Sequence, residues 1–580
     1  MALKQLIEQR TQSAFEKAGI EPAFPIRLQW SGKPEFGDMQ INGVMAAAKA
    51  ARCNPRELAS QVLEQLELDD IADKLEIAGP GFINIHLASS ALASAATSMA
   101  ADPHLGVPKT TEPQSVVVDY SAPNLAKEMH VGHLRSTIIG DAMCRILEFR
   151  GDRVIRQNHI GDWGTQFGML IAELDEQFSQ QEIDQGISLS DLEAFYRQAK
   201  QHFDQDADFA DRARRKVVEL QSGDTQCLLL WQRFIEASLE HAESIYRKLN
   251  VTLTRADAMG ESAYNEDLQP LVAELVEKGI AERDQGALVV KLQELADKEG
   301  NASVAIIQKA DGGYLYATTD LAALRYRASR LKADRCLYFI DARQSLHMKQ
   351  VFAIARRAGW VGEQLELTHC AFGTMMGADG KPFKTRSGET IKLAQLLDEA
   401  VQRAADLVQQ KNPELDAQQR DLVAQRVGIG AVKYADLSKA RTNDYRFNWD
   451  SMLSFEGNTA PYLLYAVTRI HSLFRKAGLL AAPAEAQIQV EHQAEKDLVL
   501  CLERFAEVLD QVSQSAMPHE LCAYLYDLAG RFTNFYENCP VLRSDVPQPQ
   551  RESRLALADL TRRTLQTGLE LLGIDCLEFM

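Results

Sequence analysis

Two histidines, His130 and His133, flank a Val-Gly pair where an apolar segment gives way to a helical pattern. Side chains three residues apart lie on the same side of a helical turn. The N-terminus of a helix favours an anion, and two imidazoles add donors directed at the same place. Gly132 lets a phosphate or a flat base approach the backbone. Such spacing also occurs on helix surfaces without function, but the pattern predicts a site for a nucleotide triphosphate.

The segment around these histidines contains no nucleophile and no obvious general base. Catalysis there would come from positioning and from charge stabilisation of a phosphate under attack. A second stretch, residues 375–389, carries Lys381, Lys384 and Arg386 among glycines. Such a loop can clamp a triphosphate, although a solvated basic loop is the alternative interpretation.

The elements that position the histidines follow from hydrophobic periodicity. Residues 116–118 are apolar and end in Asp119, and apolar residues from Leu134 to Leu147 then mark one face of a helix. Gly151 is a helix stop, and residues 153–157 form a second strand candidate. Strand, loop, helix and strand in this order open a doubly wound nucleotide fold, in which Asp119 would lie at the ligand-binding edge.

Further polar residues follow later strand and helix candidates. Tyr316 and Asp320 are four apart where an extended segment turns into a helix, so both can face one pocket if that helix begins near Thr318. A core role for Tyr316 and a helix-capping role for Asp320 are the alternatives. Gln344 follows the buried strand expected at residues 337–341, at the edge where ligands collect. The loop at residues 158–168 is rich in glycine and would cover the site, or form a purely structural turn.

Composition restricts the class of protein. A chain of 580 residues with 46% hydrophobic and 25% charged residues is long enough for three or four globular domains. A net charge of −18 argues against a non-specific nucleic-acid binder but leaves room for local basic surfaces. No apolar run is long enough for a membrane span, and the N-terminus is typical of an amphipathic helix, not a signal peptide. The nine cysteines occur singly, which predicts neither a zinc site nor disulfides and fits the cytoplasm.

The whole phrase at residues 119–133, Asp-Tyr-Ser-x-Pro-Asn-x-x-Lys-x-x-His-x-Gly-His, resembles the His-Ile-Gly-His element of class I aminoacyl-tRNA synthetases, and in its flanks the arginyl-tRNA synthetases. The stretch at residues 375–389 occupies the place of their Lys-Met-Ser-Lys-Ser loop but lacks the second lysine. Residues 37–42 and 79–84 resemble the N-terminal domain of arginyl-tRNA synthetases. Residues 455–469 and 573–580 resemble a helical anticodon-binding domain.

The resemblance implies an α/β plus all-α fold class. A doubly wound (Rossmann-like) catalytic domain would cover residues 115–400, with a helical insertion at about 170–255. An α+β domain that contacts the tRNA elbow at the D-loop would precede it at residues 1–110. A helical connecting segment at 401–454 would lead to an α-helical anticodon-binding bundle at 455–580.

The resemblance also implies ATP-dependent attachment of L-arginine to tRNA(Arg) through an arginyl adenylate, with release of AMP and pyrophosphate. Mg²⁺ would accompany ATP, and no zinc is expected. We expect a monomer without membrane association. The catalytic residues would be His130, His133, Lys127, Lys384 and Arg386, with Lys127 supplying the charge that the later loop lacks. ATP would be bound by Gly132, His130, His133, Lys384, Thr385 and Ser387.

The arginine site implied by the resemblance is rich in acceptors. Carboxylates match the planar fork of a guanidinium, and the residues assigned to arginine are Asp119, Asn124, Glu261, Tyr316, Asp320 and Gln344. Interleaved basic and aromatic residues at 419–450 and the start of the C-terminal bundle offer tRNA contacts at Lys439, Arg441, Tyr465 and Arg469, although a connecting helix explains the first segment equally well. Two alternatives remain open: a class I synthetase for another amino acid, and a catalytically idle tRNA-binding relative.

Overall fold

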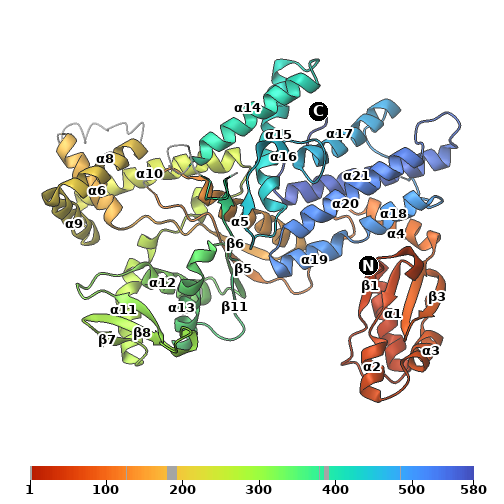
Figure 1. The fold of residues 1–580 in the computed structure, drawn as a ribbon, viewed down its shortest axis with the longest axis horizontal. Coiled ribbons are helices and arrows are strands. Elements are labelled where there is room, and N and C mark those ends of the chain that lie inside the picture. The colour runs from red at the N-terminus through yellow and green to blue at the C-terminus, as the bar shows by residue number, and fades with distance from the viewer. Residues whose placement is uncertain (1–2, 126, 179–191, 378, 384–390, 484) are drawn as a thin grey trace.

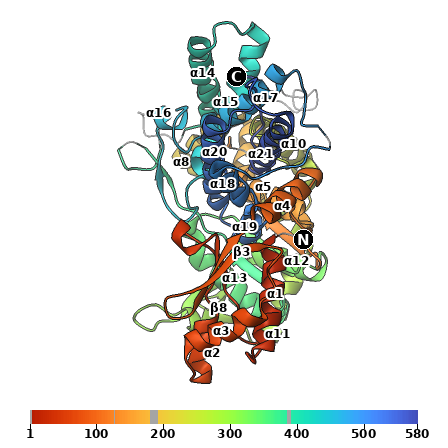
Figure 2. The ribbon, with the colours of Figure 1, turned by 90° about the vertical axis from the view of Figure 1, so that its right-hand side faces the viewer.

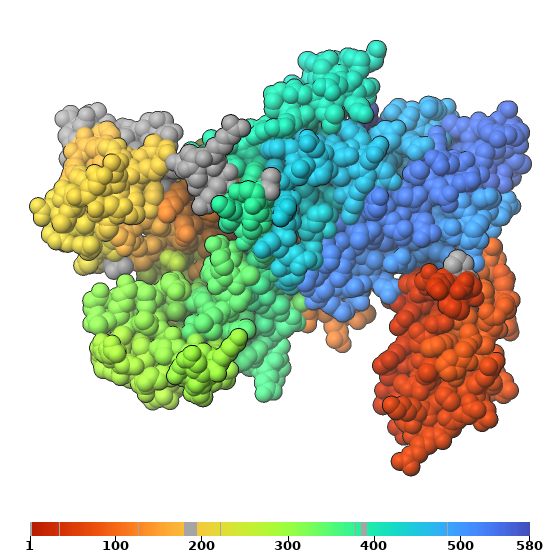
Figure 3. All heavy atoms as spheres, in the orientation of Figure 1, coloured from red at the N-terminus to blue at the C-terminus, as the bar shows by residue number. Residues whose placement is uncertain are grey.

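The computed structural model describes residues 3–125, 127–178, 192–377, 379–383, 391–483 and 485–580. Three bodies follow one another along the chain (Figure 1): an N-terminal unit, a central α/β region and a C-terminal helical bundle. The N-terminal unit projects from the rest of the molecule, as Figure 3 shows, and lies beneath the bundle, far from the parallel sheet. Among the helices of the described residues, none combines the length and hydropathy needed to cross a bilayer.

The N-terminal unit is an antiparallel sheet of order β1-β2-β4-β3 with helices packed against it. The helical pattern at residues 43–68 is divided into two helices because Arg52 adopts a left-handed conformation (φ 54°), and Asn54 then caps the next helix ahead of Pro55. The strand expected at residues 81–87 is present as β4. The elements are α1 (Leu3–Lys17), β1 (Leu28–Trp30), β2 (Met39–Ile41), α2 (Val44–Ala51), α3 (Pro55–Gln65), β3 (Ala72–Ala78) and β4 (Phe82–Leu87).

This unit is attached to the bundle by polar contacts, and Figure 2 shows the two bodies one above the other. Glu507 of the bundle accepts from Trp30 Nε1 at 2.7 Å and pairs with Lys4 at 2.5 Å. Lys496 Nζ lies 2.8 Å from Asp38 Oδ2. Helix α4 (Ser89–Ala101) continues the connection, because Arg563 donates to Ala100 O in its last turn at 2.6 Å.

The central region is organised by a parallel sheet of order β11-β10-β5-β6. Strand alternation assigns its faces: Val116 and Val118 join the core formed with α5, whereas Val117 joins the core formed with α11, α12 and α13. The chain passes from β5 to β6 on one side and later enters β10 on the other, so the strand order reverses beside β5. Ligands bind at such a switch point, beyond the carboxyl ends of the strands. The strands are β5 (Ser115–Asp119), β6 (Arg153–Gln157), β10 (Arg335–Tyr338) and β11 (Glu366–His369).

One helix beside the parallel sheet ends where the sequence pattern predicts, and another begins earlier than predicted. Helix α5 (Val131–Arg150) ends at Gly151, whose φ of 98° is the left-handed stop that was expected. Helix α12 (Tyr316–Ser329) begins two residues earlier than Thr318. The expected strands at 287–292 and 303–308 exist, but they belong to a separate antiparallel sheet. The remaining elements are β7 (Glu282–Asp284), β8 (Ala287–Leu292), β9 (Ser303–Gln308), α11 (Asn265–Glu277) and α13 (Ser345–Arg357).

The segment after β6 contains helices with apolar cores of their own, so it is more than a solvated hairpin. Phe167, Phe209 and Phe234 are fully buried within it. Its described helices are α6 (Thr165–Gln177), α8 (Leu192–Gln205), α9 (Ala207–Gln221) and α10 (Thr225–Lys248).

Helices also dominate the C-terminal part, where most aromatic residues are core residues. Tyr524, Phe532 and Phe535 are buried. The elements from the connecting segment onward are β12 (Met375–Met376), α14 (Leu393–Lys411), α15 (Ala417–Leu437), β13 (Tyr445–Arg446), α16 (Trp449–Met452), α17 (Ala460–Ala477), α18 (Gln493–Leu502), α19 (Phe505–Ser515), α20 (His519–Asn538) and α21 (Gln548–Leu571).

Candidate active site

The two histidines form the N-terminal cap of α5. His130 Nδ1 accepts from the Gly132 backbone N–H at 3.0 Å, and His133 Nδ1 accepts from the His130 N–H at 3.1 Å. The ring centroids are 4.0 Å apart. Because both Nδ1 atoms accept hydrogen bonds, the neutral rings carry their protons on Nε2, which is the tautomer that can donate to an anion. Burial, and secondarily His130, lower the pKa of His133 to about 3.

The end of the basic loop returns directly beside these histidines. Val131 N donates to Ile391 O at 3.1 Å and Leu393 N donates to Met129 O at 2.9 Å. Lys392 Nζ lies 3.0 Å from Glu128 Oε2. Lys384, Thr385, Arg386 and Ser387 lie outside the described residues. Residues 391–393, which follow them in the sequence, lie next to the histidine cap.

The start of the same loop is held as a short hairpin. Gly377 N donates to Lys381 O at 2.7 Å, and Phe383 N donates to Met375 O at 3.0 Å. The Phe383 ring lies 4.8 Å from that of Phe447. This hairpin holds residues 375–383 against the segment that follows α15.

Lys127 is exposed. Its Nζ lies over the Tyr196 ring of α8, 4.8 Å from the centroid. Lys127, which was expected to supply the cation that the later loop lacks, thus contacts the segment inserted after β6.

The acidic candidates converge on the carboxyl edge of the sheet. Asp119 ends β5 and is buried, where its Oδ2 lies 2.8 Å from Arg327 Nη2. Asp119 Oδ1 has no hydrogen-bond partner in the described part of the chain. Arg327 belongs to α12, two turns after Asp320, so one helix supplies both an internal cation and a second carboxylate.

Asp320 lies between two histidines. His347 Nε2 is 2.6 Å from Asp320 Oδ2, and His159 Nε2 is 3.4 Å from Asp320 Oδ1. Burial opposes the charge on Asp320, but the hydrogen bonds and charges of His159 and His347 prevail and hold the pKa of Asp320 below its usual range. The capping interpretation of Asp320 is wrong, since the cap of α12 is Leu315 and Asp320 lies in the second turn.

Glu261 lies beside this group, at the start of a 3₁₀ turn. The preceding Gly260 has no room for a side chain, because a Cβ there would meet Asp162 Oδ2 at 1.9 Å. Asp162 in turn accepts from Ser262 N at 3.0 Å and from Ser262 Oγ at 2.6 Å, which fixes the turn. Burial raises the pKa of Glu261 to about 7, and its nearest charged neighbours are His159, Asp320 and Asp162.

The three other residues expected to bind arginine are more exposed. Tyr316 begins α12, and its ring meets that of His347 edge-on at 4.9 Å. Asn124 pairs with Gly161 in an isolated parallel bridge, and Leu125 N donates to Gly161 O at 3.0 Å. Gln344 directly precedes α13 and is exposed. The six residues thus border one sheet edge, three in its buried part and three at the rim.

Sequence reasoning gave no role to two members of this group, His159 and Arg327, and placed His347 beside Gln344 at the end of the strand expected at 337–341 without giving it a partner. His159 was contained in the glycine-rich loop, and its position beside a helix-borne Asp320 cannot be read from spacing. Arg327 follows Asp320 by seven residues, which is a same-face helical spacing and was the available signal. Among the described residues, no group of three or more histidine, cysteine or acidic side chains has a metal-binding arrangement.

The basic residues of the connecting segment are mostly used inside the protein. Arg441 is 8% exposed and donates to Ala516 O at 2.9 Å and to Ala371 O at 2.7 Å, which argues against direct contact with RNA. Lys433 is fully buried. Lys439 is exposed, as is Tyr465, and Arg469 stacks over Tyr536 at 4.4 Å.

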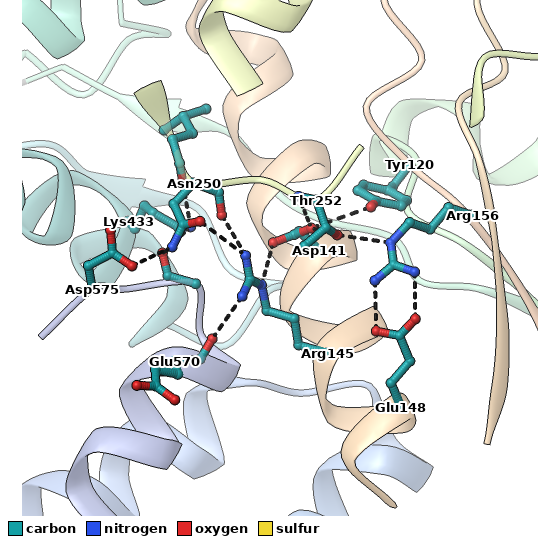
Figure 4. Close-up of polar contacts among 12 residues, drawn as sticks. Tyr120, Asp141, Arg145, Glu148, Arg156, Asn250, Thr252, Lys433, Glu570 and Asp575 are labelled. Atoms are coloured by element: carbon teal, nitrogen blue, oxygen red, sulfur yellow. Dashed lines mark hydrogen bonds and ion pairs between the residues drawn. The ribbon is translucent and has the colours of Figure 1, made fainter. Parts of the chain in front are cut away.

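A polar network connects α5 to the end of the bundle (Figure 4). Arg145 of α5 pairs with Asp141 at 2.9 Å and donates to Asn250 O at 2.8 Å. Lys433 Nζ donates to Leu249 O at 2.7 Å and to Gly573 O at 2.6 Å, and burial lowers the pKa of Lys433 to about 8. The tail after α21 is therefore tied, through the turn after α10, to the helix that carries both histidines.

Comparison with known proteins places this geometry in a family. Three family models match: "tRNA synthetases class I (R), catalytic domain" over residues 96–449, "DALR anticodon binding domain" over 463–580, and "Arginyl tRNA synthetase N terminal domain" over 1–87. An arginine–tRNA ligase of Saccharophagus degradans is 59% identical over 580 residues and both chains are fully covered.

Solved structures agree with the family models. The arginyl-tRNA synthetase of Plasmodium falciparum has a TM-score of 0.83 at 27% identity and covers 100% of this chain and 99% of its own. The Thermus thermophilus enzyme has a TM-score of 0.81 at 25% identity, with 100% of each chain covered. The expected fold class is confirmed. The chain belongs to the arginyl-tRNA synthetases, the class I arginine–tRNA ligases.

Proposed function

We propose that this chain joins L-arginine to tRNA(Arg) at the carboxyl edge of its parallel sheet, with the guanidinium bound by Asp320 and Glu261 beside Asp119. The observation that carries this proposal is the cluster of three carboxylates at the switch point beside β5. A guanidinium provides five donors in a planar fork, which carboxylates on different elements can satisfy together. Tyr316, Asn124 and Gln344 at the rim supply further polar groups for the amino acid.

The nucleotide would lie at the histidine cap. Gly132, His130 and His133 lie at the N-terminus of α5. Because the Nδ1 atoms of both histidines accept hydrogen bonds, their Nε2–H groups would donate to the α-phosphate as the arginine carboxylate attacks it. Lys384 and Arg386, with Thr385 and Ser387, would hold the departing pyrophosphate, and Lys127 would add a cation. Mg²⁺ would arrive with ATP, since its preferred site combines phosphate oxygens and water.

The geometry supports catalysis by positioning. The two neutral imidazoles can stabilise negative charge on phosphate oxygens without transferring a proton. Adenylate formation breaks the bond between the α- and β-phosphates and forms the carboxyl–phosphate bond. In the second step the terminal ribose of the tRNA displaces AMP from the activated carboxyl group.

The tRNA would contact three parts of the chain. We propose the N-terminal unit for the elbow at the D-loop. For the anticodon side we propose the exposed Tyr465 and Lys439 and the partly buried Arg469. Arg441 is left out because its donors are used within the protein.

One chain supplies every residue of the proposed site, which favours a monomer. The nine free cysteines fit a cytoplasmic enzyme.

An aminoacylation assay with tRNA(Arg) and each amino acid in turn tests this proposal. Arginine should be the substrate, and citrulline, a neutral isostere, should be rejected by roughly 10⁴-fold because it would leave a buried carboxylate unpaired. Efficient use of citrulline or of another amino acid would contradict the proposed role of the acidic cluster.

A further inference from the structure

Asp320 already has two nitrogen partners before any substrate is bound. His347 Nε2 reaches it from α13 at 2.6 Å, and His159 Nε2 reaches it from the β6–α6 loop at 3.4 Å. These nitrogens approach different oxygens of the carboxylate. A guanidinium that binds Asp320 through a two-pronged contact needs both of these oxygens. Arginine must therefore compete with the two imidazoles.

The charges around Asp320 do not balance without protons. Asp119 is neutralised by Arg327, but Asp320, Glu261 and Asp162 have no Lys or Arg partner in the described part of the chain. Both His159 nitrogens are buried, and neither makes a well-aligned hydrogen bond in the described part of the chain. Asp320 is the carboxylate that lies within ion-pair distance of His159 Nε2. The ionisable and charged groups near Asp320 and its two histidines come from several elements: Asp119 of β5, Asp162 of the loop, Glu261 and Tyr264 of the 3₁₀ turn, Tyr316 and Arg327 of α12, His347 of α13, and His369 of β11, which interacts with His347.

A buried excess of negative charge is costly, and the least costly counter-charge in the empty pocket is a proton on an imidazole. We propose that Asp320, His159 and His347 together hold a proton when the pocket is empty, and that the guanidinium of arginine displaces it, so that arginine binding releases a proton to solvent. This inference rests on the proposed function, in which Asp320 binds the guanidinium. His159 and His347 are thus positioning residues that keep the carboxylate oriented and its charge balanced until the substrate arrives.

The direction of ionisation in the empty pocket agrees with this. Burial disfavours the cation of His159, but its contact with Asp320 and the charges of Asp320 and Asp119 prevail and raise the pKa of His159 above its ordinary value. The positive charge of Arg327 lowers the pKa of His159. The positive charge of an incoming guanidinium would lower it more strongly because it would lie closer. Three interacting groups titrate as a unit, so the displaced proton belongs to the triad and not to one ring.

The pH dependence follows from linkage. Below the apparent pKa of the triad, arginine must displace a bound proton, so its affinity increases with pH. Above that pKa, no proton is bound and the affinity becomes independent of pH. One displaced proton corresponds to about a tenfold change in Kd per pH unit in the sloping range.

Calorimetric titration of the full chain with arginine, in two buffers of different ionisation enthalpy, counts the protons directly. Between pH 6 and 8 the native protein should release up to about one proton per arginine, and Kd should fall with increasing pH. The same pH series can be read from KM for arginine in aminoacylation. The double variant His159→Gln/His347→Gln should lose the part of the proton release and of the slope that the triad contributes, leaving only the part that belongs to Glu261, whose pKa is about 7. His347→Gln alone, at a partly buried residue, should reduce both. His86→Gln is the matched control, since His86 Nε2 is also 3.4 Å from a carboxylate, Glu76 Oε1, in the N-terminal unit.

Two results would overturn the inference. One is native protein that releases no proton at any pH in this range, a test that requires no variant. The other is proton release that persists undiminished in the double variant and disappears in Glu261→Gln, which would identify Glu261 as the source. The outcome for Asp320→Asn separates the two proposals: if this variant binds arginine as tightly as the native chain, the proposed function of Asp320 fails. If it binds weakly while the native chain shows no proton release, only the present inference fails.

Discussion

Asp119 Oδ2 and Arg327 Nη2 lie 2.8 Å apart in the buried part of the candidate arginine site. The side chain of Arg327 is only 1% exposed and that of Asp119 only 5%. An arginine of the protein itself thus takes one oxygen of a carboxylate that the sequence assigns to the substrate arginine. The other oxygen, Oδ1, is the one that remains for a ligand.

Replacing Arg327 with methionine should destabilise the fold strongly. Removing one partner of a buried ion pair leaves an uncompensated charge, which costs about 3–5 kcal/mol. Urea denaturation monitored by circular dichroism measures the change. Arg330→Met, three residues later at an exposed position, should stay within about 1 kcal/mol of the native protein. Equal stability of the two variants would show that the pair contributes little.

The lowered pKa of His133 predicts an acid-sensitive fold. The ring titrates at about 3 in the folded chain and near 6.5 when unfolded, so the unfolded state binds more protons between these values. Stability should therefore decrease as pH falls from 6.5 towards 3, by up to about 1.4 kcal/mol per pH unit from this residue. The difference in unfolding free energy between the native chain and His133→Gln, measured across this range, should show that slope. A difference that is independent of pH would contradict the assignment.

Lys127 should matter for adenylate formation. Its ammonium lies over the Tyr196 ring, and in the proposed function it supplies the charge that the later loop lacks. Lys127→Ala should lower the rate of pyrophosphate exchange by ~100-fold, as expected for the loss of one group that stabilises transition-state charge. Lys298→Ala, at an exposed distant position, is the control. If Lys127→Ala has no effect while Lys384→Ala abolishes exchange, the proposal that Lys127 supplies the charge of the missing loop lysine is wrong.

Gly260→Ala should impair arginine binding without changing ATP binding. Its Cβ would meet Asp162 Oδ2 at 1.9 Å and displace the carboxylate that fixes Ser262 and the Glu261 turn. We expect kcat/KM for arginine to fall at least about tenfold, or 1.4 kcal/mol, with KM for ATP unchanged. Gly530→Ala is a matched control, because a Cβ there meets nothing within 4 Å. An unchanged KM for arginine would show that Glu261 does not take part in arginine binding.

Local patterns predicted the parts of the fold that depend on local chemistry. The limits of α5 followed from helical periodicity and from Gly151, and β5 from an apolar run that ends in Asp119. The position of Asp119 at the ligand-binding edge followed from the topology of parallel sheets, whereas its convergence with Asp320 was implied by the family resemblance alone. Such rules concern neighbours in sequence or a whole class of fold, so a single chain is sufficient to apply them.

The same reasoning could not predict contacts between residues that are far apart in the sequence. Arg441 and Lys433 are charged and flanked by aromatic residues, which is typical of an RNA-binding surface, yet both donate to backbone carbonyls inside the protein. Periodicity shows which face of a helix is apolar but not which carbonyl a long cation reaches. For the same reason the contact of His159 with Asp320, 161 residues apart, could not be predicted from either segment.

The most direct test of this account is the specificity constant for arginine after Asp320→Asn. The substitution keeps the shape of the side chain and removes the charge that faces the guanidinium. We predict that kcat/KM for arginine in aminoacylation falls by ~100-fold or more, about 3 kcal/mol, while KM for ATP and the same constants of the exposed control Asp267→Asn stay near native values. An Asp320→Asn enzyme that charges tRNA(Arg) with native kcat/KM for arginine would contradict the account.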